Sequence, residues 1–491
     1  MNSLSLKISV LLFSLAGALT AQKAGMPADS ASSPPPLDWP AFRRQVLDNH
    51  PAATQAGLYR DLAAAALLRA RGGFDPKAYA DYSGKNFKEK TYFQYTEAGL
   101  KWPSWLGIEL KGAWNYATGD YLNPETRLPS NGQASFGFNW TLGQGLFIDE
   151  RRAAMRQAQI GVQQGEAERA TALNDLLLDA AKTYWTWAAA DNQLAIYEEA
   201  LRQAGLRNDA IRESFLQGDK PAVDTLESFI QVQNRTLDVN FARTERQNAL
   251  LALRNFLWTP DNQPLAPDTD LTAPPILSEI FVSLTPDGIR ELQQEARSQH
   301  PELRQYEAKL RSLDVERRLK NEKRKPVLDV SYSLLGAGWQ FFPSGDADVA
   351  GALAGDIKWG INFGYPLLNR KARGDLQITE IKIAQTRCEL QQKRQQIDNK
   401  IGQYGNELGN LANQIALYRG IVQNYRQLLE AENEKFRFGE SSVFLVNSRE
   451  QRWLEAQIKY VKLLSEYRKT EAGLLWSAGK LLYMSHPEFL K

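Results

Sequence analysis

The sequence has few of the residues that build disulfides, metal centres and active sites. Among 491 residues there is one cysteine, Cys388, which excludes a disulfide framework and a four-thiolate metal site. The three histidines (His50, His300 and His486) are scattered, which argues against a metal cluster. Lys and Arg (59) nearly balance Asp and Glu (57), so nothing indicates a nucleic-acid partner. With no nucleophile–base arrangement and no phosphate loop, we predict neither an enzyme nor a bound cofactor.

Long apolar runs are also missing after the N-terminus. Residues 1–21 have the features of a signal peptide, with Lys7 ahead of a short apolar stretch and small residues at its end. That stretch is shorter than the ~20 residues that a membrane helix needs. We therefore expect an exported chain that is either soluble or crosses a membrane with β-strands. Residues 22–37, rich in Pro and Ser, are predicted to be a flexible leader.

The chain contains an internal repeat. The matching pairs are His50-Pro51 with His300-Pro301, Pro76 with Pro326 and Tyr82-Ser83 with Tyr332-Ser333, then Leu146 with Leu367, Phe215 with Phe436 and Gly218 with Gly439. The offset is about 250 positions in the first set and about 221 in the second, so the first copy holds roughly 29 more residues between Ser83 and Leu146. We predict a first repeat at 38–258, a Pro-rich linker at 259–286, a second repeat at 287–483 and a tail at 484–491.

Four segments alternate between apolar and polar residues, which predicts strands with two unlike faces. They cover 106–116, 135–142, 328–334 and 357–365. One face is rich in aromatics and the other in Gly, Asn and charge, which is typical of a membrane barrel. A half-exposed soluble sheet shows the same alternation and is the alternative. A further segment, 85–105, alternates in part and is a candidate for an additional hairpin near the barrel base.

Very long helices are predicted after the strands. There is no proline between Pro129 and Pro221, or between Pro366 and Pro487, and a proline inside a helix costs about 3 kcal/mol. Apolar residues in the second of these stretches recur in steps of four and three from Ile397 to Leu429, and the pattern recurs in the first copy. This is a heptad seam. A helix of about 65 to 70 residues spans roughly 100 Å.

Each long helix is predicted to end at a Phe-x-x-Gly pattern, at 215–218 and 436–439. Glycine suits a helix end that needs a positive φ. The chain resembles the TolC-like outer-membrane factors, which are outer-membrane efflux proteins. The resemblance is based on these tips, on the order of the elements and on the segments that follow the strands, 143–148 (GQGLFI) and 365–370 (YPLLNR). The resemblance covers about 38–483.

The resemblance implies a mainly α fold with membrane β-structure. Long coiled-coil hairpins would form a periplasmic α-helical tunnel, and four strands per chain would build a twelve-stranded barrel in outer-membrane lipid. It implies a homotrimer that binds a periplasmic adaptor and an inner-membrane pump and acts as a passive exit duct for small molecules. Two alternatives are the outer component of a type I protein secretion system and, in another class, a soluble periplasmic coiled-coil scaffold.

The candidate functional residues lie at the predicted helix tips. Asp224 is the first candidate for a pore constriction, because three copies around an axis would form a carboxylate ring. The alternative is a helix cap, since Asp224 and Glu227 have capping-box spacing. Asp219 and Glu440 are further constriction candidates. Gly218 and Gly439 are candidates for the adaptor contact. The second-copy counterpart of Asp224 is Leu445, which departs from the paired acidic residues of the family.

Overall fold

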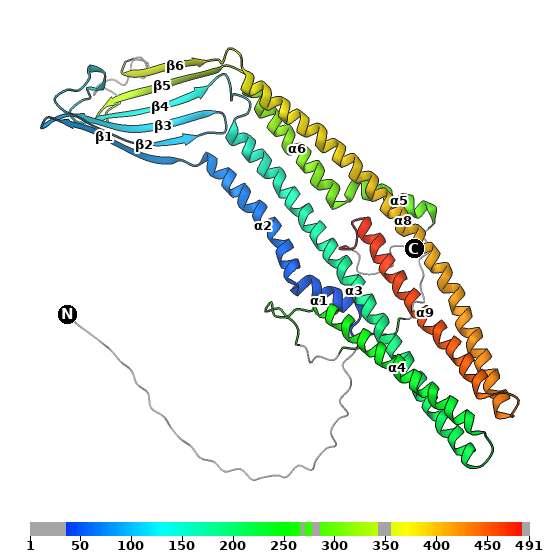
Figure 1. Ribbon diagram of the computed structural model, residues 1–491. Coiled ribbons are helices and arrows are strands. Elements are labelled where there is room, and N and C mark those ends of the chain that lie inside the picture. Colours follow the sequence, from blue (N-terminus) through cyan, green and yellow to red (C-terminus); the bar gives the residue numbers. More distant parts are fainter. Residues whose placement is uncertain (1–35, 267–270, 277–284, 342–354, 484–491) are drawn as a thin grey trace, which may run out of the picture.

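The computed structural model describes residues 36–266, 271–276, 285–341 and 355–483. The predicted signal peptide, most of the leader, parts of the linker and the tail with His486 lie outside the described residues. The described chain is elongated, with a β-sheet at one end and the tips of two helical hairpins at the other (Figure 1).

The described residues form one antiparallel sheet, with six strands in the order of the sequence. The strands are β1 (Lys77–Phe87), β2 (Lys90–Pro103), β3 (Ile108–Thr118), β4 (Gln133–Thr141), β5 (Val327–Ala337) and β6 (Ile357–Gly364). The membrane-type β-structure expected from alternation is present, but the number of strands differs from the expected four. Segment 85–105 contributes the end of β1 and all of β2.

The repeat shows which two strands are additional. β1 and β5 each have 11 residues, and each follows a helix that begins at the repeated His-Pro pair. β4 and β6 each lead into a very long helix. Among the described residues, the hairpin β2–β3, residues 90–118, therefore has no counterpart in the second copy. This corrects the assignment of 85–105 as the additional segment, because the strand at 106–116 belongs to the insertion as well.

The helices repeat in the same order. The first copy has α1 (Trp39–Asn49), α2 (Pro51–Arg71), α3 (Glu150–Leu216) and α4 (Ala222–Arg254), with short 3-10 turns at Gly72–Phe74 and Pro124–Thr126; the second has α5 (Pro286–Gln299), α6 (Pro301–Glu322), α8 (Arg370–Arg437) and α9 (Val443–Ser477). α3 has 67 residues and α8 has 68, so each is about 100 Å long. α2 packs on the half of α3 nearer the sheet and α4 on the other half, as α6 and α9 do on α8 (Figure 1).

The predicted heptad seam of α8 is the buried side of that helix. Six of its ten residues are buried and four are half-buried, and none is exposed: the buried ones are Ile397, Ile401, Leu408, Leu411, Ile415 and Leu429, and the others are Tyr404, Tyr418, Val422 and Tyr425. An apolar stripe of this kind lets α8 pack against shorter neighbouring helices along its length. The seam explains why such long helices stay paired.

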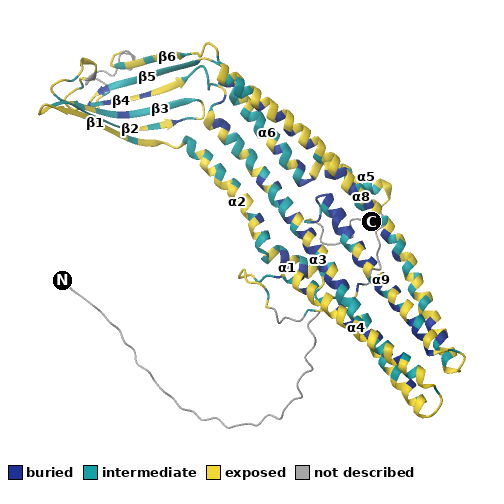
Figure 2. Cartoon of the chain, in the orientation of Figure 1, coloured by how far each residue is buried: buried dark blue, intermediate teal, exposed yellow. Residues whose placement is uncertain are grey.

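The largest hydrophobic core lies midway along the molecule, where helices of both copies meet. Phe42 stacks on Tyr184 with ring centroids 5.3 Å apart, and Trp187 and Tyr467 are fully buried in the same cluster. Figure 2 shows buried residues concentrated in this middle part and exposed ones at the sheet and the tips. No helix among the described residues has the length and apolar character needed to span a membrane.

Candidate functional site

The six-stranded sheet has one apolar and one polar face. Pairing in register places side chains of neighbouring strands on the same face, so Trp140, Val330 and Ile361 form a row across β4, β5 and β6. Large side chains of this face are exposed: Trp359 and Phe363 are both 68% exposed. A soluble protein rarely leaves so many aromatics in water on one surface. The apolar face is therefore the surface that contacts lipid.

The opposite face of the sheet is polar and hydrogen-bonded. Lys111 Nζ lies 2.8 Å from Glu97 Oε1, and the Tyr79 hydroxyl donates to the same oxygen at 2.7 Å. The Tyr95 hydroxyl donates to Asn115 Oδ1 at 2.8 Å. These residues come from β1, β2 and β3, so the inserted hairpin follows the two-faced pattern of the other strands. A polar lining of this kind faces water.

At the far end of the molecule, both long helices stop in the same way. Gly218 has φ +86° and Gly439 has φ +80°, a conformation that favours glycine. The amides of Gly218 and Asp219 donate to the carbonyls of Phe215 and Ser214, and those of Gly439 and Glu440 repeat the pattern with Phe436 and Lys435. Each tip is thus a Schellman motif. The geometry explains why a glycine occurs at the same place in both tips.

Asp219, Glu440 and both glycines are exposed in these turns, and Asp224 is half-buried. The N-cap of α4 is Pro221, which makes no side-chain cap. The capping alternative for Asp224 is therefore wrong: its carboxylate belongs to the first helical turn, where the helix dipole favours negative charge. Leu445 occupies the matching position in the first turn of α9.

The two tips lie close together. Lys220 Nζ sits 4.4 Å from the centre of the Phe436 ring, so the loops that carry Asp219 and Glu440 are neighbours. Further from the tips, Arg207 Nη1 of α3 donates to Glu450 Oε2 at 2.6 Å and to Asn447 Oδ1 at 2.9 Å in α9. Sequence reasoning missed this link, because it joins two copies of the repeat and has no local pattern.

Apolar side chains also gather at the tips, and sequence reasoning did not single them out. The exposed residues are Leu216, Val223, Leu226, Phe438 and Phe444. Phe438, the C-cap residue of α8, is 81% exposed. The signal that could have found them is the presence of large apolar residues beside turn glycines in polar surroundings. Exposed apolar groups of this kind mark a contact surface.

The two histidines that precede prolines, His50 and His300, have a structural role. His50 Nδ1 accepts from the Ala52 amide at 3.1 Å, and His300 Nδ1 accepts from the Glu302 amide at 3.2 Å. Each imidazole therefore caps the helix that follows a kink. Burial lowers the pKa of both, for His300 to about 4, so the neutral acceptor form is present at neutral pH. No group of three or more described His, Cys, Asp or Glu side chains is placed to hold a metal.

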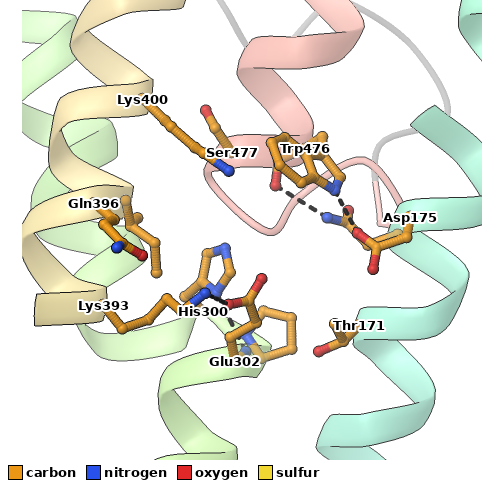
Figure 3. A pocket seen from close by; sticks show the side chains of 12 residues that line it. Thr171, Asp175, His300, Glu302, Lys393, Gln396, Lys400, Trp476 and Ser477 are labelled. Atoms are coloured by element: carbon orange, nitrogen blue, oxygen red, sulfur yellow. Dashed lines mark hydrogen bonds and ion pairs between the residues drawn. The ribbon is translucent and has the colours of Figure 1, made fainter. Parts of the chain in front are cut away.

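His300 borders a small pocket where α3, α6, α8 and α9 meet (Figure 3). Lys393 pairs with Glu302 at 2.6 Å, and Trp476 Nε1 donates to Asp175 Oδ1 at 2.6 Å. Burial raises the pKa of Asp175. These contacts connect α8 with α6 and α9 with α3. We therefore interpret the pocket as a place where helices pack together rather than as a ligand site.

A two-faced membrane sheet joined to helices about 100 Å long defines the class of outer-membrane channels with a helical shaft. The family model of the outer membrane efflux proteins matches residues 109–257 and 292–480. The chain belongs to this family, and it lies in the outer membrane with its helical part in the periplasm. The resemblance predicted from sequence is confirmed.

Solved structures of outer-membrane channels are similar along most of the chain. The open-state MtrE channel of Neisseria gonorrhoeae is 14% identical, with 90% of this chain and 89% of that one covered and a TM-score of 0.64. VceC of Vibrio cholerae is 14% identical, with 89% and 95% covered and a TM-score of 0.62. CmeC of Campylobacter jejuni is 15% identical, with 90% and 85% covered and a TM-score of 0.59. No curated protein sequence matches the chain.

Proposed function

We propose that the protein is the outer-membrane channel of a tripartite efflux system. A homotrimer would form a passive exit duct for small molecules, coupled to a periplasmic adaptor and an inner-membrane pump. One observation carries this proposal: a sheet with a lipid-compatible face passes without interruption into paired helices that end in exposed tips. The helices of one chain do not enclose a pore. Several copies must therefore surround a common axis to form the duct.

The tips are the proposed contact with the adaptor. They lie at the end of the molecule opposite the sheet (Figure 1), so they reach furthest from the outer membrane. Gly218 and Gly439 leave each turn uncovered, since a Cβ added at either position would meet no atom within 4 Å. The neighbouring exposed residues, Phe438 and Leu216 among them, supply apolar area for a protein partner.

The same tips are the proposed constriction. Asp224, Asp219 and Glu440 lie at or near the two turns, which contact each other through Lys220 and Phe436. Three copies would repeat each carboxylate around the axis. Such a ring attracts cations and repels anions. Because Leu445 replaces an acidic residue in the second copy, the ring at this level would have three carboxylates rather than six.

Reconstitution in planar bilayers tests the proposal. We expect discrete conductance steps with cation preference, and resistance to extraction by carbonate from membranes. A protein that washes off in carbonate and does not conduct would contradict the duct. Export of small molecules is tested separately by expression, with a matching adaptor and pump, in a host without its own exit duct. Conductance without restored drug export would favour the protein-secretion alternative.

A further inference from the structure

Both edges of the sheet are open in the single chain. The strand order begins with β1 and ends with β6, and neither has a partner on its outer side among the described residues. An open edge in lipid leaves backbone N–H and C=O groups unpaired, at a cost of several kcal/mol for each group. If the protein is a trimeric membrane duct as proposed above, each β6 must meet a β1 of another copy.

The inserted hairpin β2–β3 belongs to the wall that these edges close. Its apolar positions line up with those of the neighbouring strands: Trp102 pairs with Leu110, which pairs with Phe138. Its polar positions do the same, as Lys101 pairs with Lys111. A hairpin folded into the lumen or left in water would not need a lipid-compatible face in register with the rest of the sheet. All six strands therefore count towards closure.

The internal repeat indicates which residues would pair where β6 of one chain meets β1 of the next. β4 precedes α3 as β6 precedes α8, and β1 follows α2 as β5 follows α6. The pair β4–β5 inside one chain is therefore the equivalent of β6 with β1 of the next chain. We propose that three copies close an eighteen-stranded barrel through this seam, with Trp359 opposite Tyr82 of the next subunit.

Side chains at the seam are complementary in this register. Trp359 and Tyr82 correspond to Phe138 and Tyr332, whose ring centroids are 6.0 Å apart inside the chain. Both seam aromatics are exposed in the monomer, 68% and 69%. On the polar face, the pair Ser135–Leu335 maps onto Asp356 opposite Lys85 of the next subunit.

The eighteen strands are antiparallel throughout, because each chain contributes an even number of them. With strands about 4.8 Å apart and tilted by about 40°, eighteen strands give a mean barrel diameter of about 36 Å, against about 24 Å for twelve. The shaft still has the helices of three chains with two hairpins each. The barrel is thus expected to be wider than the barrel of a four-strand subunit, while the shaft keeps its width.

Two measurements test the seam on the full-length protein. Top views by electron microscopy of the trimer in lipid nanodiscs should show a barrel about 1.5-fold wider than that calculated for twelve strands. In a Cys388→Ser background, the pair Ser83→Cys and Lys358→Cys should be joined between subunits by a short bismaleimide, giving covalent dimers and trimers on denaturing gels. Ser83 and Lys358 correspond to Ser333 and Gly137, which face each other inside the chain.

Control pairs make the cross-linking decisive. Lys77→Cys with Lys358→Cys is six residues out of register along β1, roughly 20 Å, and should stay monomeric on the gel. Asn115→Cys with Lys358→Cys reports closure through β3, as in a twelve-stranded barrel. Cross-linking of that pair, or a barrel of the narrower diameter, would overturn the proposal. A conducting trimer with either result would leave the proposed duct intact, whereas a protein without conductance would contradict the duct itself.

Discussion

At the scale of single residues, His300 shows how a buried cap makes stability depend on pH. Its imidazole is 5% exposed and accepts a hydrogen bond from the Glu302 amide through Nδ1. Burial, with nearby Lys393 and Lys400, lowers its pKa from 6.5 to about 4, and Glu302 acts in the opposite direction. The folded state therefore resists protonation that the unfolded chain accepts.

We predict that His300→Asn reduces the acid sensitivity of the protein. Stability linked to His300 is present above pH 6.5 and is lost as pH falls from about 6.5 towards 4, by at most roughly 3 kcal/mol. Asparagine keeps a capping oxygen and does not titrate. The melting temperature in detergent should fall less between pH 7.5 and 5 in the variant than in the wild type. His50→Asn is the matched control, with a smaller expected effect; equal pH dependence of wild type and His300→Asn would contradict the assignment.

Asp224 is the residue with which the proposed constriction is tested. Removal of three carboxylates from one level of the pore would lower the attraction for cations. We predict that Asp224→Ala reduces cation preference and raises single-channel conductance or antibiotic leakage, measured in bilayers and by susceptibility. Asp224→Asn separates charge from size, because it should change selectivity with less effect on conductance. Unchanged selectivity and conductance in both variants would remove Asp224 from the constriction.

At the scale of elements, the two faces of β6 should differ in how well they tolerate the same substitution. Ile361 lies on the apolar face and its neighbour Asn362 on the polar face. A lysine on the lipid face costs about 2–4 kcal/mol at the bilayer midplane, whereas a lumen position tolerates it. We predict that Ile361→Lys lowers the folded fraction in outer membranes and Asn362→Lys does not, measured by heat-dependent mobility on gels. Similar losses in both would argue against the assigned faces.

The elements differ in how far the sequence predicts them. The long helices follow from absent prolines and a sustained heptad, and their ends at Gly218 and Gly439 follow from glycine and a positive φ. β1 was missed as a strand, because only Tyr82 is a large apolar residue on its lipid face, between alanines and glycine. β1 is recognised as part of the sheet through its pairing with β2. The alternation within one strand does not reveal with which strand it pairs.

The candidate site was predictable only in its local parts. The two turns have a sequence signature, since each needs a glycine at the position with positive φ. Asp224 lies in the first turn of α4 because the helix begins after Pro221. Proline has no side-chain group that could cap a helix, so the sequence does not identify Pro221 as the N-cap. The contact between Lys220 and Phe436 joins residues of different copies, so it depends on how whole hairpins pack. Long-range packing of this kind leaves no pattern in the sequence.

At the scale of the whole molecule, the contacts between the two copies of the repeat differ along the length of the helices. The largest apolar cluster joins both copies in the middle. Beyond it, α3 and α9 are joined by a smaller apolar cluster of Ala200, Leu454 and Ile458 and by polar contacts. Arg207 and Glu450 form one of these polar contacts, with side chains 18% and 5% exposed. We expect this pair to specify how the two helices align, because a buried ion pair adds little net stability over an apolar contact. Movement of one hairpin relative to the other is therefore expected to depend on this pair.

We predict that Glu450→Gln loosens the contact between the two hairpins without unfolding the middle of the molecule. The amide keeps the shape but loses the charge that strengthens the hydrogen bond from Arg207, at a cost of about 2 kcal/mol. Nitroxides at Asp219→Cys and Glu440→Cys, in a Cys388→Ser background diluted with unlabelled subunits, report the separation of the tips by electron spin resonance. The distance distribution should broaden towards longer values in Glu450→Gln. Glu199→Gln is the matched control, because Glu199 pairs with Arg202 on the exposed surface of one helix and should leave the distribution unchanged. The same narrow distribution in both variants would show that Arg207 and Glu450 do not set the alignment, and the apolar contacts of α3 with α9 would then carry it.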